Sequence, residues 1–123
     1  MIKEIIIKNT NKPFGVKELS TEIGISESYL RDMWYQKFKI NPGLIIETIR
    51  LDIAVKLIFE INLKIYEICG QVGYKNLITF RNAFKRRFNM TPKACRQIIK
   101  KSNKEEKNKL RKLLLNNLDD IYR

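Results

Sequence analysis

Apolar residues recur along the chain at intervals of three and four, which is the spacing of one face of an α-helix. The dipeptides Asn-Gly and Asp-Gly, which mark tight hairpins, are absent from the sequence. Residues 2–9 are ambiguous, because Ile2, Ile5 and Ile6 have helical spacing while a run of β-branched residues also suits a strand. The pattern as a whole predicts an all-α fold.

Residues 16–38 predict two short helices separated by a turn. The first ends at Gly24, and its apolar side consists of Val16, Leu19, Ser20 and Ile23. Ser26 is suited to cap the second helix, about residues 26–38, whose apolar stripe is Tyr29, Leu30, Met33, Trp34 and Phe38. A helix, a turn with glycine and a capped helix together form a helix-turn-helix.

The longest apolar pattern begins at Asn41-Pro42, a helix cap followed by proline at the first helical position, and continues to about Ile61. Twenty helical residues extend about 30 Å. This length is close to the rise of one turn of B-DNA, about 34 Å. Residues 41–62 are therefore predicted to form a linker helix.

The helix-turn-helix pattern occurs a second time, about 49 residues further along the chain. Gly73 takes the place of Gly24, and the apolar residues before it are Ile65, Ile68, Cys69 and Val72. The next segment, about residues 76–88, places on one face Phe80, Ala83, Phe84 and Phe88. This internal repeat predicts two helix-turn-helix subdomains, residues 1–40 and 63–101, joined by the linker helix.

Two more helices are predicted after the second repeat. Thr91-Pro92 is another cap followed by proline, and it opens a helix to about Lys101. The tail, residues 102–123, begins with Ser102 and Glu105 at the spacing of a capping box. Its apolar residues have helical spacing and either pack on the body of the domain or bind a partner: Leu110, Leu113, Leu114, Leu118 and Ile121.

Charge is concentrated in one part of the chain of 123 residues, whose formal net charge is +12. Residues 63–101 hold 10 basic residues and 1 acidic residue, and therefore supply three quarters of the excess. Such a concentration is typical of a polyanion-binding surface or of a solubilising face. No apolar stretch approaches the roughly 18 residues that span a bilayer, and the N-terminus does not resemble a signal peptide. We therefore expect a cytoplasmic protein without membrane contact.

The residue types that support catalysis are scarce. The chain has no histidine, which is the commonest general base and metal ligand. Cys69 and Cys95 lack the spacing of a zinc site, and they either remain reduced or pair in a disulfide. No glycine-rich phosphate loop is present. We expect neither an enzyme nor a bound metal or other cofactor.

The second helix of a helix-turn-helix enters the major groove, so the side chains opposite its apolar stripe are the candidate DNA contacts. In the first repeat these are Glu27, Ser28, Arg31, Asp32 and Tyr35. In the second repeat they are Ile78, Thr79, Arg81, Asn82, Lys85 and Arg86. Arginine suits guanine, asparagine suits adenine, and threonine or isoleucine can contact a thymine methyl group. Asp32 would be repelled by phosphates, so it either accepts from a cytosine amine or orients Arg31.

Two groups of residues have a second interpretation. The run Lys85-Arg86-Arg87 either contacts DNA or is a solvated helix face. Phe80, Phe84 and Phe88 could stack on single-stranded bases, but their spacing of four favours the core. Tyr29 and Trp34 are predicted to lie in the core for the same reason.

A set of spaced motifs carries a family resemblance. In the second repeat they are Ile68, Gly73-Tyr74, Phe80, Phe84-Lys85-Arg86-Arg87-Phe88 and Thr91-Pro92. Earlier in the chain they are Arg50-Leu51-x-x-Ala54 and Gly24-x-Ser26-x-x-Tyr29-Leu30. With these motifs, residues 16–97 resemble the DNA-binding domain of the AraC/XylS family of bacterial transcription regulators.

The resemblance implies seven helices, binding to double-stranded promoter DNA and control of transcription. Carried over position by position, it places base contacts at Ser28, Arg31, Asp32, Leu77, Ile78, Thr79, Arg81 and Asn82. Combined with the helix faces, the candidate DNA-binding set is Ser28, Arg31, Asp32, Tyr35, Asn76, Leu77, Ile78, Thr79, Arg81, Asn82, Lys85 and Arg86.

The chain departs from the family pattern at the helix ends and in the first repeat. Lys39 and Asn89 stand where the family tends to have glycine, and Trp34-Tyr35 replaces its usual Phe-Lys pair. The first repeat is also nearly neutral, since residues 1–40 hold 7 basic and 5 acidic residues. We therefore expect the second unit to supply most of the affinity for DNA.

The resulting hypothesis is a sequence-specific transcription regulator, expected to be an activator that binds DNA as a monomer and has RNA polymerase as a further partner. No small-molecule effector domain fits in the 15 residues before the first unit or the roughly 26 after the second. The chain is thus a small stand-alone regulator or a piece of a longer one. The alternatives are a non-specific nucleic-acid-binding protein that uses the basic segment 63–101, and a protein-interaction module that uses the C-terminal helix.

Overall fold

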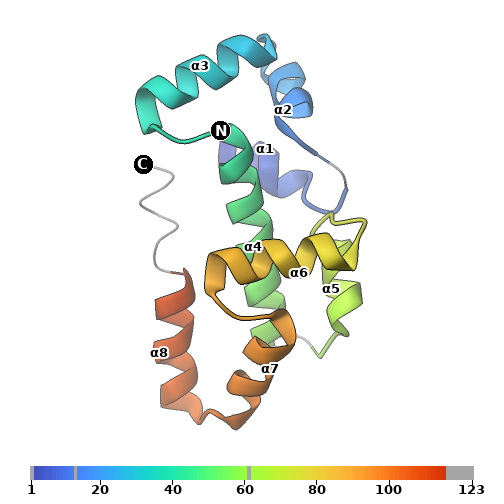
Figure 1. The fold of residues 1–123 in the computed structure, drawn as a ribbon, viewed down its shortest axis with the longest axis vertical. Coiled ribbons are helices and arrows are strands. Elements are labelled where there is room, and N and C mark those ends of the chain that lie inside the picture. The colour runs from blue at the N-terminus through green and yellow to red at the C-terminus, as the bar shows by residue number, and fades with distance from the viewer. Residues whose placement is uncertain (1, 13, 61, 116–123) are drawn as a thin grey trace.

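The computed structural model describes residues 2–12, 14–60 and 62–115 (Figure 1). This part of the chain contains α-helices and no strand, which confirms the predicted all-α fold. The segment that also suited a strand is helical. The helices are α1 (Ile2–Lys8), α2 (Val16–Ile23), α3 (Glu27–Phe38), α4 (Pro42–Glu60), α5 (Ile65–Gln71), α6 (Leu77–Phe88), α7 (Pro92–Lys101) and α8 (Lys104–Leu115).

Helix α4 is the axis of the molecule, and the other helices lie around it (Figure 1). Its first half contributes Ile45 and Ile49 to a core shared with α1, α2 and α3, here named the N-terminal core. Its second half contributes Ala54 and Ile58 to a core shared with α5, α6, α7 and α8, here named the C-terminal core. One helix therefore supplies side chains to both cores, which explains why its apolar pattern is the longest in the sequence.

The phenylalanine stripe of α6 is buried, as its spacing predicts. Phe80 and Phe84 have no exposed surface, and Phe88 is 9% exposed. The rings pack on one another, with centroids 5.9 Å apart for Phe80 and Phe84 and 4.7 Å apart for Phe84 and Phe88. The interpretation of these residues as a platform on which single-stranded bases stack is therefore wrong.

In α3 the predicted apolar stripe is too wide. Leu30 and Trp34 are buried, but Tyr29 is 59% exposed and Met33 is 41% exposed. The buried pair, one turn apart, packs into the N-terminal core, while Tyr29 and Met33 project from an adjoining side of the helix. The core assignment of these two residues is thus corrected, and they add apolar surface to α3.

The predicted helix caps are present, with one displacement. Ser26 Oγ accepts from Tyr29 N at 3.1 Å, and Thr91 Oγ1 accepts from Ala94 N at 3.1 Å. The capping box of α8 forms one residue later than predicted: Asn103 Oδ1 accepts from Glu106 N at 2.8 Å, and Asn103 N donates to Glu106 Oε1 at 2.9 Å. Ser102 instead ends α7, where its hydroxyl donates to a carbonyl of the preceding turn, that of Ile98.

The tail helix α8 packs on the C-terminal core through part of its apolar pattern. Leu114 is buried, and Leu110 is half-buried against the same core. Leu113 is 73% exposed and does not pack on the core, so at this position the alternative of contact with a partner stays open. Leu118 and Ile121 lie outside the described residues.

Both cysteines are free and buried, so the disulfide alternative is not adopted in this fold. Cys95 lies in the C-terminal core without exposed surface, and burial raises the pKa of its thiol to about 11. A thiol with this pKa stays protonated at neutral pH and is unreactive. Cys95 thus behaves as a small apolar side chain.

Arg50 of α4 is buried between the two halves of the molecule. Its guanidinium donates to the carbonyls of Lys12 and Phe14, each at 2.9 Å, and to that of Thr10 at 3.0 Å. It also donates to the carbonyl of Val72, at the end of α5. Arg50 therefore ties the connection before α2 and the turn of the second helix-turn-helix to the same point on α4.

The residues that follow α2, α3 and α6 have a left-handed backbone conformation. Gly24 follows α2 with φ of 87°, while Lys39 follows α3 with φ of 62° and Asn89 follows α6 with φ of 59°. The two positions at which the family pattern has glycine thus keep the glycine-like backbone without the glycine. A lysine in this region is strained, whereas asparagine tolerates it better.

We predict that Lys39→Gly raises the free energy of unfolding by about 0.5–1 kcal/mol, because it removes the strain of the side chain in the left-handed region. Asn89→Gly is the matched variant and should change the free energy by only a few tenths of a kcal/mol. Urea denaturation of both variants measures the difference. Equal effects at the two positions would contradict the strain argument.

Candidate nucleic-acid interface

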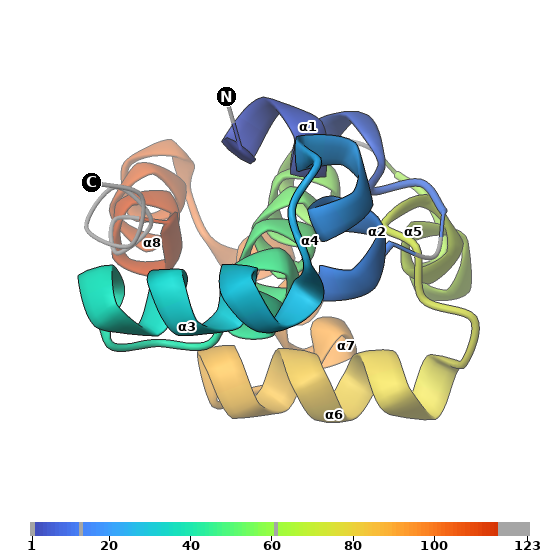
Figure 2. The ribbon, with the colours of Figure 1, turned by 90° about the horizontal axis from the view of Figure 1, so that it is seen from above.

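The second helices of the two helix-turn-helix units, α3 and α6, lie on the same side of α4 (Figures 1 and 2). Figure 2 shows both along one edge of the molecule, and both run in the same direction from their first to their last residue. They are displaced from one another along the axis of α4 (Figure 1). The fold thus presents two helices to one side, separated by the length of their common support.

The residues predicted to contact DNA lie mostly on the open sides of these helices. Because Phe80 and Phe84 turn one side of α6 into the core, the opposite side faces solvent. The exposed members of the set are Ser28, Asp32, Tyr35, Asn76, Ile78, Thr79, Arg81, Asn82, Lys85 and Arg86, and the half-buried ones are Arg31 and Leu77. Ile78 is 65% exposed at the first turn of α6, so an aliphatic side chain is available there for a thymine methyl group.

Asn76 has a structural role at the start of α6. Its Oδ1 accepts from Ile78 N at 2.8 Å and from Thr79 N at 3.2 Å, which caps the helix. Its side-chain oxygen is therefore engaged in fixing the first turn of α6. This turn carries the exposed residues Ile78 and Thr79.

Arg31 of α3 is held by neighbouring side chains. It donates to Glu27 Oε1 at 2.9 Å, one turn earlier, and to Asn41 Oδ1 at 3.2 Å. These partners replace the one considered from the sequence: Asp32 does not orient Arg31 in this structure. Asp32 is exposed, and it remains a candidate for direct contact with a base.

The three basic residues 85–87 of α6 have different environments. Lys85 is exposed, and Arg86 contacts Glu47 of α4 at 3.2 Å with 67% of its side chain exposed. Arg87 is 18% exposed and forms a two-point ion pair with the buried Asp52 of α4, with its Nε 3.2 Å from Oδ1 and its Nη2 3.4 Å from Oδ2. The run therefore contains two surface residues and one that joins α6 to α4.

Asp52 is 3% exposed, and burial raises the pKa of its carboxyl to about 7 against the opposing influence of Arg87.

Arg81 differs from the other arginines of α3 and α6, because no acid among the described residues lies within ion-pair distance of it. Its guanidinium is thus available to a ligand without the loss of an internal pair.

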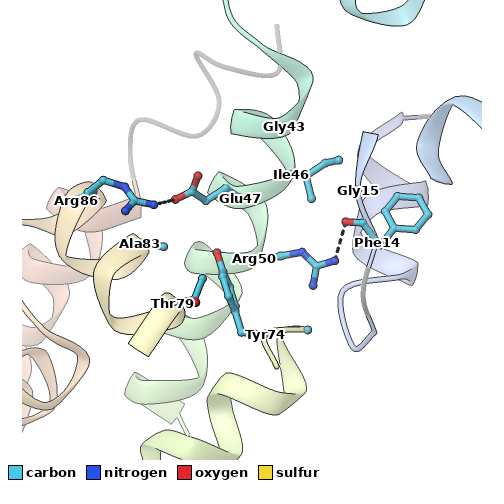
Figure 3. Close-up of a pocket in the computed structure, with 11 residues that line it drawn as sticks. Phe14, Gly15, Gly43, Ile46, Glu47, Arg50, Tyr74, Thr79, Ala83 and Arg86 are labelled. Carbon is cyan, nitrogen blue, oxygen red and sulfur yellow. Dashed lines mark hydrogen bonds and ion pairs between the residues drawn. The ribbon is translucent and has the colours of Figure 1, made fainter. Parts of the chain in front are cut away.

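A cleft of about 430 Å³ lies between α4, α6 and the start of α2. Figure 3 shows Arg86 pointing toward Glu47. Tyr74 and Thr79 line the same cleft. Burial and the nearby Glu47 carboxylate raise the pKa of Tyr74 to about 12, so its hydroxyl keeps its proton at neutral pH. Arg50 lines the cleft from α4 and donates to Phe14 across it (Figure 3).

Sequence reasoning assigned no role to Glu47, Arg50 or Asp52. A signal was present, because these three charged residues interrupt the most apolar helix of the chain. Burial of a charge requires partners, so charges within such a helix indicate contacts with other elements.

No helix in the described part of the chain has the length and apolarity needed to cross a membrane. Among the same residues, no three histidine, cysteine, aspartate or glutamate side chains form a metal site.

Known proteins share this arrangement. Residues 19–98 match the model of a helix-turn-helix domain family, which is AraC-type. The HTH-type transcriptional regulator AlkR of Acinetobacter baylyi is 33% identical over 86 residues, which are 70% of this chain and 28% of that protein. The chain therefore spans less than a third of the length of this relative.

Solved structures agree with the fold. The C-terminal domain of the two-component response regulator yesN from Fusobacterium nucleatum superposes with a TM-score of 0.72 at 31% identity, covering 77% of this chain and 93% of that one. A regulator from Chromobacterium violaceum, described as AraC-type, has a TM-score of 0.73 at 20% identity. The match covers 83% of this chain and 91% of that one. The second likeness concerns the fold alone. Taken together, the matched residues and the arrangement of the helices show that the chain belongs to the AraC-type helix-turn-helix family of DNA-binding transcription regulators.

Proposed function

We propose that the protein binds a specific duplex sequence by inserting α3 and α6 into successive segments of the major groove. The observation that carries the proposal is the placement of both helices on one side of α4, each with most of its candidate contacts exposed (Figure 2). The 19 residues of α4 extend about 29 Å, close to the roughly 34 Å rise of one duplex turn. Modest bending of the duplex accommodates the difference.

The proposal includes a monomer on DNA, because both recognition helices belong to one chain. It also includes activation of transcription through contact with RNA polymerase, as expected from the sequence. The contacts on DNA are the residues assigned above, with Ile78, Thr79, Arg81 and Asn82 of α6 reading bases.

Selection of bound sequences from a random DNA library at physiological salt tests the proposed specificity. We expect a consensus with two short blocks about one helical turn apart, since each recognition helix reads one segment. A featureless pool would overturn this proposal. It would favour non-specific binding through the basic segment 63–101, where affinity depends on phosphates alone.

We propose that α6 supplies more of the affinity than α3. The exposed side of α6 carries Arg81 without an acidic partner, whereas Arg31 of α3 is already held by Glu27 and Asn41. Arg31 therefore has fewer free N–H groups and a neutralised charge to offer to DNA, whereas Arg81 offers its whole guanidinium.

Arg81→Ala is accordingly predicted to weaken binding to the selected duplex by about 5- to 150-fold, which corresponds to about 1–3 kcal/mol for an arginine that reads guanine. Arg31→Ala should have a smaller effect. Fluorescence anisotropy titrations of both variants at one fixed salt concentration measure the two changes. An effect of Arg31→Ala far larger than that of Arg81→Ala would reverse the assignment.

A further inference from the structure

Glu47 is an acidic residue of α4 that lies beside α6, the helix whose basic residues are proposed to contact DNA. Its carboxylate accepts from Arg86 Nη2 at 3.2 Å, with 30% of the Glu47 side chain exposed. The hydroxyl of Tyr74 points toward Glu47, and Thr79 lies in the same cleft (Figure 3). Arg86 thus binds this carboxylate, and Tyr74 and Thr79 line the same cleft.

Arg86 is in the last turn of α6. In a helix-turn-helix, residues near the start of the recognition helix read base edges, so a residue near its end is placed for the DNA backbone. A phosphate offers Arg86 the same charge and a similar oxygen geometry to the Glu47 carboxylate. The carboxylate and a phosphate therefore compete for one guanidinium.

We propose that Glu47 masks Arg86 in the free protein and that a phosphate of the DNA backbone takes its place on binding. This inference rests on the proposed function, and it assigns Glu47 as a residue that lowers affinity for DNA. Phosphate contacts do not depend on sequence, so the masking weakens binding to every duplex by the same factor. Discrimination between sequences stays with the residues that touch bases.

The test is a set of variants titrated against the selected duplex and against a random duplex of equal length. Glu47→Gln should strengthen binding to both by about three- to five-fold, the scale of an exposed ion pair. Arg86→Gln should weaken binding to both equally and reduce the salt slope by about 0.9, the value for one lost phosphate contact. In the Arg86→Gln background, Glu47→Gln should change affinity by less than two-fold.

Glu60→Gln is the matched control, because it removes the same charge from the other end of α4, where Glu60 is exposed. It should leave the affinity within two-fold of the wild-type value. Thermal melts confirm that each variant is folded, which is expected since the Glu47–Arg86 pair is at the surface.

Two results would overturn the masking proposal: no gain in affinity from Glu47→Gln, or an equal gain with and without Arg86, which would indicate a general charge effect. Failure of the proposed function gives a different result. In that case the wild-type protein does not distinguish the selected duplex from the random one, whatever the behaviour of Glu47→Gln.

Discussion

Replacement of Gly73 by alanine is expected to lower the free energy of unfolding by about 3–5 kcal/mol, through left-handed strain and the loss of buried hydrogen bonds. Gly73 has φ of 89°, and an added Cβ would lie 1.6 Å from Arg50 Nη1 and 2.5 Å from the carbonyl oxygen of Thr10. The guanidinium cannot move aside without leaving the carbonyls that it binds, among them that of Val72. The substitution therefore disrupts the buried contact that joins the two halves of the molecule.

Gly24→Ala is the control for the backbone alone. Gly24 occupies the same place in the first repeat with φ of 87°, but an added Cβ would have no neighbour within 4 Å. Its cost is limited to the left-handed conformation, about 1–2 kcal/mol. Urea denaturation of both variants measures the free energies, and equal losses would show that the contact with Arg50 contributes nothing.

The second large effect is expected from Arg87→Met, which leaves the carboxylate of Asp52 buried without its partner. Removal of one member of a buried ion pair costs up to about 3–5 kcal/mol while the remaining group stays charged. Because the carboxyl of Asp52 has a pKa of about 7 and can take up a proton instead, the charge-dependent part of the loss is limited to about 1.4 kcal/mol at pH 8. Asp52 is 3% exposed, so water cannot take over the role of Arg87. Arg86→Met is the neighbouring control, and it should cost less than about 1 kcal/mol because the Arg86–Glu47 pair is exposed.

The loss caused by Arg87→Met should depend on pH. Burial raises the pKa of Asp52 to about 7 from an ordinary value of 3.8, and Arg87 acts in the opposite direction, so the variant has a still higher pKa in the folded state. Because the pKa of Asp52 is higher in the folded state than in the unfolded state, its contribution to the free energy of unfolding is complete below the unfolded pKa. This contribution is lost as the pH rises through the folded pKa. At pH 5 the carboxyl is protonated in both folded proteins, and little charge is left uncompensated.

Urea denaturation at pH 5 and pH 8 measures this dependence. The difference in unfolding free energy between the wild type and Arg87→Met should be about 1 kcal/mol larger at pH 8 than at pH 5. The same difference at both pH values would show that the carboxylate of Asp52 is not the source of the loss, and that Arg87 acts through packing.

The open side of α6 could be predicted because its buried side is marked by phenylalanines, which are rarely left in water. The same reasoning was wrong for α3, since the ring hydroxyl of Tyr29 and the flexible thioether of Met33 are compatible with a partly exposed position. The internal repeat predicted the order of the helices, from α2 and α3 to α5 and α6. It did not indicate how much of each helix face the core would cover.

The partners of the arginines could not be predicted. Arg86 binds Glu47 and Arg87 binds Asp52, in both cases across more than thirty residues, and spacing along a helix reveals only neighbours three or four residues apart. The acceptors of Arg50 are backbone carbonyls, which every residue carries. Their role depends on the path of the chain before α2 and after α5, which no side-chain pattern records.

Because one uninterrupted helix supports both halves, its phase constrains the spacing of any sites that they contact. Insertion of a single residue between Ile49 and Ala54 would rotate everything that follows by about 100° about the axis of α4. Such a change would carry α6 away from the side that α3 occupies. Variation in the distance between contacted segments is therefore restricted to steps of whole helical turns, or must be accommodated by the duplex itself.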